Sequence, residues 1–174
     1  PFILKGRMIL QQLCMENVKW DKVVNELMEK EWEFWKTCIQ ELSKVRIARC
    51  LRRKGCEKMT HCSLHFFSDA SGSGYGVVVY IRSLCEDNNV FCNLVVAKSR
   101  VAPLKFVSVP RLELTTATLA VKFAVQLREE LDMEINEKVF WTDSKVVLSY
   151  IQNTKKRFKT FVANCIHQIK SCTD

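Results

Sequence analysis

Residues 64–99 contain three apolar, strand-like runs separated by short turns, and this pattern restricts the fold more than any other feature. The runs cover residues 64–68, 75–82 and 91–99. The turns are Ser71-Gly72-Ser73-Gly74 and Glu86-Asp87-Asn88-Asn89, made of residues that favour turn geometry. Turns this short join antiparallel neighbours. The sequence therefore predicts an antiparallel meander, in which the nearly all-apolar run 75–82 is buried on both faces.

Helices are predicted both before and after this meander in the sequence. A basic loop at 100–109 leads to a helix from Pro110 to about Leu131, with proline at a favourable first position. A fourth strand (138–142) and two helices (144–152 and 158–171) follow. Before the meander, apolar residues spaced about 3.6 apart predict a helix from about 23 to 44 that Asp21 could cap, preceded by a short helix at 6–16. We therefore expect an α/β domain at 61–174 and a helical segment at 1–55.

Three acidic residues occupy the ends of these elements. Asp69 ends the first strand, Glu113 opens the long helix, and Asp143 follows the fourth strand. If they converge, their oxygens would form a divalent-metal site. Each residue also has a simpler explanation: Asp69 as a turn residue, Glu113 as a carboxylate favoured by the helix dipole, and Asp143 as a helix cap. The shared order of strand, helix and strand favours the metal site over these three separate explanations. In addition, the small residues in line with Glu113 on the helix would turn its side chain toward the sheet.

The net charge indicates the kind of partner, and the cysteines and the lack of a membrane or signal segment indicate the cellular compartment. The chain has 27 basic and 19 acidic side chains, a net charge of +8, in keeping with a polyanionic partner such as nucleic acid. The alternative for any single basic cluster is a solvated surface. With no membrane-length apolar run and no signal-peptide layout, we expect an intracellular protein, cytoplasmic or nuclear. The nine cysteines form no CxxC pair and are interpreted as reduced, mostly buried thiols.

Four motifs surround the acidic residues: Ser68-Asp69-Ala70-Ser71, residues 96–105 (VAKSRVAPLK), residues 109–114 (VPRLEL) and residues 140–148 (FWTDSKVVL). Together they resemble the ribonuclease H region of BEL/Pao retrotransposon polyproteins. Residues 6–11, Trp20-Asp21 and residues 32–35 are similar to the segment that joins reverse transcriptase to ribonuclease H in that family. The family is often labelled a peptidase, but the chain has no Asp-Thr-Gly or Asp-Ser-Gly protease motif.

The resemblance implies a ribonuclease H-like fold, which is a mixed sheet with flanking helices. It implies hydrolysis of RNA in RNA–DNA hybrids with two Mg²⁺ or Mn²⁺ ions. Asp69 would bridge both ions, and Glu113 and Asp143 would hold the ion on the leaving-group side. The implied partners are the hybrid and the rest of the polyprotein, including reverse transcriptase. The expected nucleic-acid contacts are Lys98, Arg100, Lys105 and Arg111.

The C-terminal part departs from this family pattern. Ribonuclease H proteins place a fourth carboxylate after a fifth strand, at the start of a final helix. Here Asp174 directly follows a predicted helix, so we do not count it as that carboxylate. We therefore expect a C-terminally truncated domain with impaired hydrolysis and an open edge at strand 138–142. Whether it is an enzyme stays open: the alternative is a non-catalytic nucleic-acid-binding or inert remnant of a degenerate or domesticated retroelement.

Overall fold

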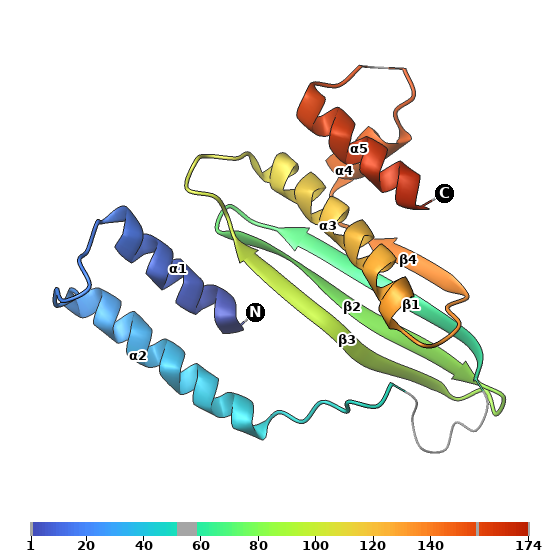
Figure 1. Cartoon of the computed structure of the whole chain (residues 1–174), viewed down its shortest axis with the longest axis horizontal. Helices are drawn as coiled ribbons and strands as arrows, with labels where there is room; N and C mark the ends of the chain where they lie inside the picture. Colours follow the sequence, from blue (N-terminus) through green and yellow to red (C-terminus); the bar gives the residue numbers. More distant parts are fainter. Residues whose placement is uncertain (1, 52–58, 156, 174) are drawn as a thin grey trace.

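The computed structural model describes residues 2–51, 59–155 and 157–173 (Figure 1). The strands are β1 (Met59–Ala70), β2 (Gly74–Cys85), β3 (Val90–Val101) and β4 (Glu137–Trp141). The helices are α1 (Phe2–Met15), α2 (Glu26–Glu41), α3 (Val109–Glu130), α4 (Lys145–Gln152) and α5 (Thr160–Thr173), with a 3-10 turn at Leu42–Lys44. None of the described helices is long and apolar enough to cross a membrane.

The four strands form one mixed sheet in the order β3-β2-β1-β4. β1, β2 and β3 pair antiparallel, as the short turns predicted, whereas β4 pairs parallel to β1. A parallel neighbour needs a long crossover connection, and α3 supplies it. This mixed sheet with flanking helices confirms the predicted fold class.

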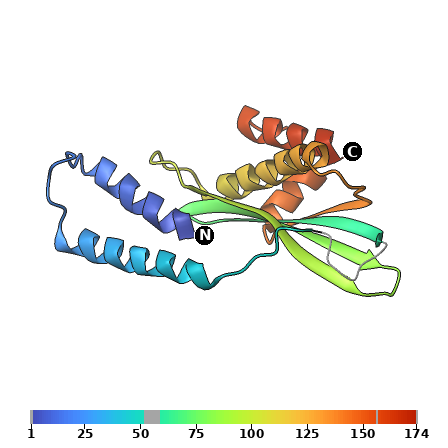
Figure 2. The ribbon, with the colours of Figure 1, turned by 60° about the horizontal axis from the view of Figure 1, so that its bottom comes forward.

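The main core lies between one face of the sheet and α3. Phe66, Val79 and Ile81 are each 0% exposed and pack with Ala120 and Ala124 of α3. The small alanine side chains bring the helix close to the strands. A second cluster joins α3 to α4 and α5 through Leu114, Val121, Val147, Val162, Ile166 and Ile169. Figure 2 shows α3 and α5 on the same side of the sheet.

The prediction that β2 is buried on both faces was wrong. Its odd-numbered residues Val77, Val79 and Ile81 lie under α3, but Tyr80 is 40% exposed on the opposite face. The strand alternates because α3 covers only one face along most of its length (Figure 2).

The N-terminal helices pack on each other and reach the sheet through α1. The ring of Trp35 lies against Gly6, and its Nε1 donates to the carbonyl of Phe2 at 2.8 Å. Arg7 Nη1 donates to the carbonyl of Ser99 on β3 at 3.2 Å. Asp21 does not cap α2: Asn25 does, accepting a hydrogen bond from the Met28 amide at 2.8 Å, so the helix begins at Glu26. The domain boundary predicted at residue 55 lies outside the described residues.

The cysteines differ from the prediction of nine reduced, mostly buried thiols. Cys85 is disulfide-bonded. Among the free cysteines in the described ranges only Cys62 is buried, because it faces the core under α3, and this burial raises the pKa of its thiol. Cys14 and Cys92 are exposed. Cys92 lies on β3, which has no neighbour on its outer side in the described sheet.

Candidate functional site

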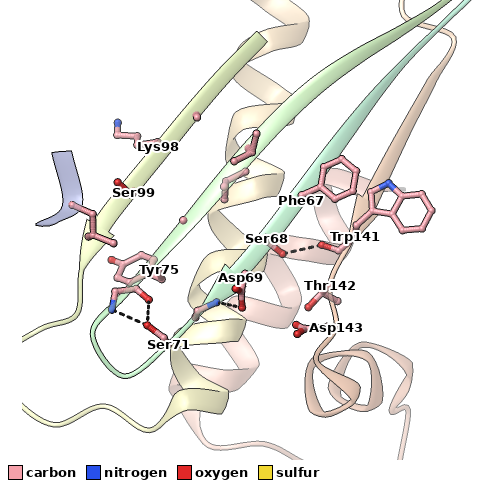
Figure 3. A pocket seen from close by; sticks show the side chains of 17 residues that line it. Phe67, Ser68, Asp69, Ser71, Tyr75, Lys98, Ser99, Trp141, Thr142 and Asp143 are labelled. Carbon is pink, nitrogen blue, oxygen red and sulfur yellow. Dashed lines mark hydrogen bonds between the residues drawn. The ribbon is translucent and has the colours of Figure 1, made fainter. Parts of the chain in front are cut away.

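Asp69 and Asp143 end two neighbouring parallel strands. The register pairs Phe67 of β1 with Trp141 of β4, so each aspartate lies two residues beyond a paired position. The C-terminal ends of the two strands therefore lie side by side. Both aspartates line a single cavity of about 670 Å³ there (Figure 3). The structure therefore brings together two of the three predicted site carboxylates.

Both aspartates are exposed in this cavity. Asp69 Oδ1 accepts a hydrogen bond from the amide of Ala70 at 2.6 Å. In the described part of the chain, no lysine, arginine or histidine forms an ion pair with Asp69, Asp143 or Glu113. Two like charges at one cavity repel each other, and a bound cation would offset that repulsion.

Glu113 is half-buried on α3, and its carboxylate is held by Ser144, the residue that follows Asp143 in the chain. Its Oε2 accepts a hydrogen bond from Ser144 Oγ at 2.7 Å. Ser144 is only 6% exposed and caps α4, where its Oγ accepts from the Val147 amide at 3.2 Å. Glu113 does not line the cavity. Across residues 2–51, 59–155 and 157–173, no group of three histidine, cysteine or acidic side chains is arranged to hold a metal ion.

The simpler explanations for the three acids fare differently. Asp143 does not cap α4, because Ser144 is the capping residue. Glu113 lies beyond the first turn of α3, which contains no acidic residue, so a helix-end charge does not explain it. Asp69 does contact the backbone of the next residue, as a turn residue would. The helix-cap explanation for Asp143 and the helix-dipole explanation for Glu113 are therefore both wrong.

The four basic residues predicted to contact nucleic acid are all exposed, and two of them lie over aromatic rings. Lys98 Nζ lies 5.7 Å from the centroid of the Phe123 ring, so its side chain is turned toward α3, although Lys98 also lines the cavity. The Arg111 guanidinium lies 5.6 Å from the centroid of the Phe161 ring of α5. Arg100 and Lys105 have neither an aromatic nor an acidic partner among the described residues.

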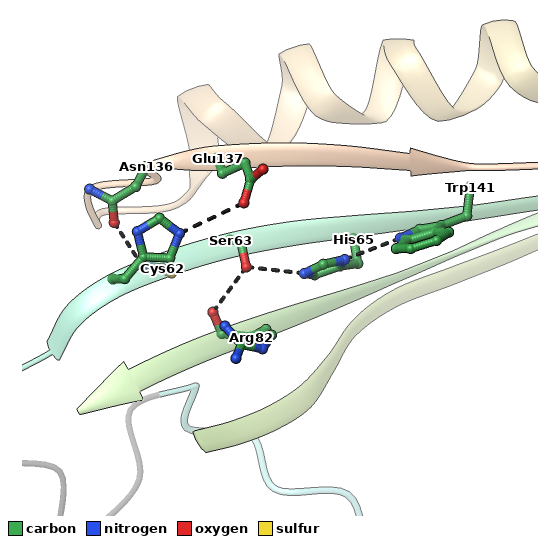
Figure 4. A network of polar contacts seen from close by, with 8 residues as sticks. Cys62, Ser63, His65, Arg82, Asn136, Glu137 and Trp141 are labelled. Atoms are coloured by element: carbon green, nitrogen blue, oxygen red, sulfur yellow. Dashed lines mark hydrogen bonds and ion pairs between the residues drawn. The ribbon is translucent and has the colours of Figure 1, made fainter. Parts of the chain in front are cut away.

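A polar network beside the cavity was not foreseen from the sequence (Figure 4). Trp141 Nε1 donates to His65 Nδ1 at 3.1 Å, so Nδ1 accepts and the ring proton sits on Nε2. Nε2 then donates to Ser63 Oγ at 3.0 Å. This fixes Trp141 parallel to the Phe67 ring, with centroids 5.9 Å apart, at the wall of the cavity. The available signal was the alternation of residues 63, 65 and 67, which places them on one face of β1.

These features define a class of protein. An antiparallel meander, a crossover helix and a parallel fourth strand, with acidic residues at the ends of β1 and β4 and on the helix, form a ribonuclease H-like domain. Residues 1–144 match the family described as the Pao retrotransposon-like RNaseH-like domain. The chain belongs to this family, as the motifs around the acids predicted.

Several solved ribonuclease H domains are similar to this chain at low sequence identity. The N-terminal RNase H domain of a Mycobacterium tuberculosis protein is 16% identical, with a TM-score of 0.43 over 64% of this chain and 73% of that one. RNase H1 of Halobacterium salinarum is 10% identical, with a TM-score of 0.40 over 65% and 76%. LC11-RNase H1, solved in complex with an RNA/DNA hybrid, is 17% identical, with a TM-score of 0.39 over 64% and 75%. A comparison with curated proteins found no match.

Proposed function

We propose that this chain is the ribonuclease H domain of a retroelement polyprotein and hydrolyses the RNA strand of RNA–DNA hybrids. Membership of a retrotransposon-like RNaseH-like family supports the retroelement context. The observation that carries the catalytic part is the cavity that Asp69 and Asp143 share at the ends of adjacent parallel strands. Reverse transcriptase and the remaining polyprotein are its proposed partners.

The donor set fits a hard divalent cation. The carboxylates of Asp69 and Asp143 are unpaired with any described cationic side chain and face one cavity, and such oxygens are what Mg²⁺ and Mn²⁺ prefer. Glu113 would complete the set by exchanging its hydrogen bond with Ser144 for the metal. When bound, the proposed pair of ions activates a water molecule and stabilises the leaving oxygen.

The chain's own basic residues would hold the substrate. Lys98, Arg100, Lys105 and Arg111 are exposed and carry no ion pair with a described acid, so their charges are available to phosphates. An RNA–DNA hybrid is gripped mainly through its backbone and 2′-hydroxyls, which requires such cations around the carboxylates. The repulsion between Asp69, Asp143 and the substrate phosphates explains why cleavage would require a bound cation.

The test is a cleavage assay on an RNA–DNA hybrid, with Mg²⁺ and Mn²⁺ in parallel reactions. Asp143→Asn keeps the size of the side chain but removes one ligand charge, so we expect it to abolish cleavage while leaving the thermal unfolding profile intact. Full cleavage by Asp143→Asn would refute the site assignment. Asp132→Asn, at an acid outside the cavity, is the matched control and should cleave like the wild type.

A second candidate function is hybrid binding without cleavage. It is favoured by the absence of a three-ligand metal group among the described residues. In this case the wild type would bind the hybrid in a salt-sensitive way but would cleave it with neither metal ion. The same assay, run with a parallel binding measurement, separates the two functions.

A further inference from the structure

One wall of the carboxylate cavity is aromatic. Phe67 of β1 and Trp141 of β4 both line the cavity and are paired in the sheet. Their rings are nearly parallel, with an interplanar angle of 7° and centroids 5.9 Å apart. Figure 3 shows the two rings side by side, with their faces turned toward the viewer. Phe67 is 44% exposed and Trp141 is 48% exposed, so much of this wall is open to a bound molecule.

Hydrogen bonds fix the orientation of the Trp141 ring. Its Nε1 donates to His65 Nδ1 at 3.1 Å, and the His65 ring stacks on the indole with centroids 6.2 Å apart. His65 is held in turn through its Nε2, which lies 3.0 Å from the Oγ of Ser63, a residue that is only 1% exposed. The indole is therefore oriented before any ligand arrives, which lowers the entropic cost of binding against it.

The chemistry of this wall matches a base rather than a hydrogen-bonding group. The Trp141 N–H already has its acceptor, so Trp141 offers a ligand the flat face of its indole. Nucleic-acid bases stack on such faces whatever their sequence, because every base has a flat π-face. Inside a duplex both faces of a base are covered by its neighbours, so an unpaired base is the one that can stack on a side chain.

The aromatic wall continues into the two carboxylates. Phe67 and Asp69 are two residues apart in β1, so their side chains lie on the same face of the strand, about 7 Å apart. Trp141 likewise precedes Asp143 by two residues, and all four side chains line the same cavity. The exposed Lys98 lines it too and would offset the charge of a phosphate. A strand with one phosphate at a cation held by the carboxylates would therefore bring a neighbouring base to the rings.

We propose that Trp141, together with Phe67, is a stacking site for an unpaired base of the bound nucleic acid, and that His65 is the positioning residue that fixes the indole. This inference rests on the proposed function and deepens it. It names RNA–DNA hybrids that carry a single-stranded segment as the preferred substrate of the cavity. The carboxylates and the aromatic wall would then contact neighbouring nucleotides of one strand.

The test compares two RNA–DNA hybrids that differ only in the bases of an unpaired extension. One carries a short single-stranded extension on each strand, and the other carries abasic extensions of the same length, which have the same phosphates. The full chain is titrated with each fluorescently labelled hybrid in EDTA, so that binding does not depend on the metal. The wild type should bind the extension with bases about tenfold more tightly, as expected for one base stacked on an aromatic side chain. The two salt slopes should be equal, because the hybrids carry the same charge.

Replacing the indole tests the wall directly. Trp141→Ala should reduce the preference for the extension with bases from about tenfold to nearly none, because the stacking surface is lost. Trp20→Ala, at a fully exposed tryptophan between α1 and α2, is the matched control and should keep the wild-type preference.

Two substitutions of His65 test its positioning role. His65→Leu removes the acceptor of the indole proton, so it should reduce the preference about threefold, as expected for a net hydrogen bond. His65→Asn should retain the preference, because its amide oxygen can accept the same proton close to the position of Nδ1. Both variants lose the contact with Ser63, so rescue by asparagine alone separates positioning from a general loss of stability. A wild-type preference in His65→Leu would overturn the positioning role.

The outcomes separate this proposal from the proposed function. Equal binding of the two hybrids by the wild type, or a preference that survives in Trp141→Ala, would overturn the stacking site and leave the proposed function standing. Absence of binding to either hybrid would instead refute the proposed function itself. Dimer formation that Trp141→Ala abolishes, without any preference for bases, would show that a second copy of the chain covers the wall and would also overturn the stacking site.

Discussion

Replacing Ser144 by alanine should destabilise the protein by about 2 kcal/mol. The hydroxyl of Ser144 is buried and makes two contacts at once: it caps α4 through the Val147 amide and donates to Glu113. Loss of a serine cap costs about 1 kcal/mol. A hydrogen bond to a carboxylate is worth about 1.5–3 kcal/mol, but Glu113 is half-buried and regains water, so we assign about 1 kcal/mol to it.

Urea denaturation of the wild type and Ser144→Ala measures this loss. At 2–4 °C per kcal/mol for a chain of this size, the midpoint of thermal unfolding should fall by roughly 4–8 °C. Ser149→Ala, at an exposed serine of the same helix, is the control and should change stability by less than about 0.5 kcal/mol.

A double-mutant cycle with Glu113→Ala isolates the bond between the two side chains. If the hydrogen bond is formed, the cycle should give a coupling free energy of about 1 kcal/mol. Additive effects of the two substitutions, or a Ser144→Ala loss below about 0.5 kcal/mol, would refute the reasoning, because the capping and hydrogen-bond contributions would then be absent.

Three further predictions concern the core, the helix pair and pH. Phe66→Ala should cost roughly 3–5 kcal/mol in urea unfolding, because Phe66 is fully buried against Phe140; a loss below about 1 kcal/mol would contradict the packing. Gly6→Ala should destabilise the α1–α2 contact by roughly 1–3 kcal/mol, because its Cβ would lie 2.5 Å from the Trp35 ring; unchanged tryptophan fluorescence and stability would argue against this contact. Burial raises the pKa of Cys62, so the folded state favours the neutral thiol: this stabilisation is full below the unfolded pKa of about 8.5 and is lost as pH rises through the raised value. The stability gap between wild type and Cys62→Ala should therefore shrink at alkaline pH, and a constant gap would exclude the linkage.

Local sequence signals were sufficient for most of the fold. The turns at 71–74 and 86–89 set the antiparallel meander, and Pro110 marked the start of α3 to within one residue. The start of α2 was misplaced because Asp21 was the predicted cap, whereas the Asn25 side chain, four residues later, accepts the capping hydrogen bond from the Met28 amide. The burial of β2 was misjudged because an apolar residue such as Tyr80 looks the same in sequence whether or not a helix covers it.

The sequence by itself determined the family, the order of strands and helices, and the three acidic residues at or near their ends, because these depend on residue type and local spacing. Only the tertiary structure decided how the acids meet. Asp69 and Asp143 share a cavity because β4 pairs parallel to β1, a contact between residues far apart in the chain. Glu113 does not line this cavity, because the packing of α3 against α4 places its carboxylate beside the buried hydroxyl of Ser144. Such distances follow from helix and strand packing, which no local pattern of residues specifies.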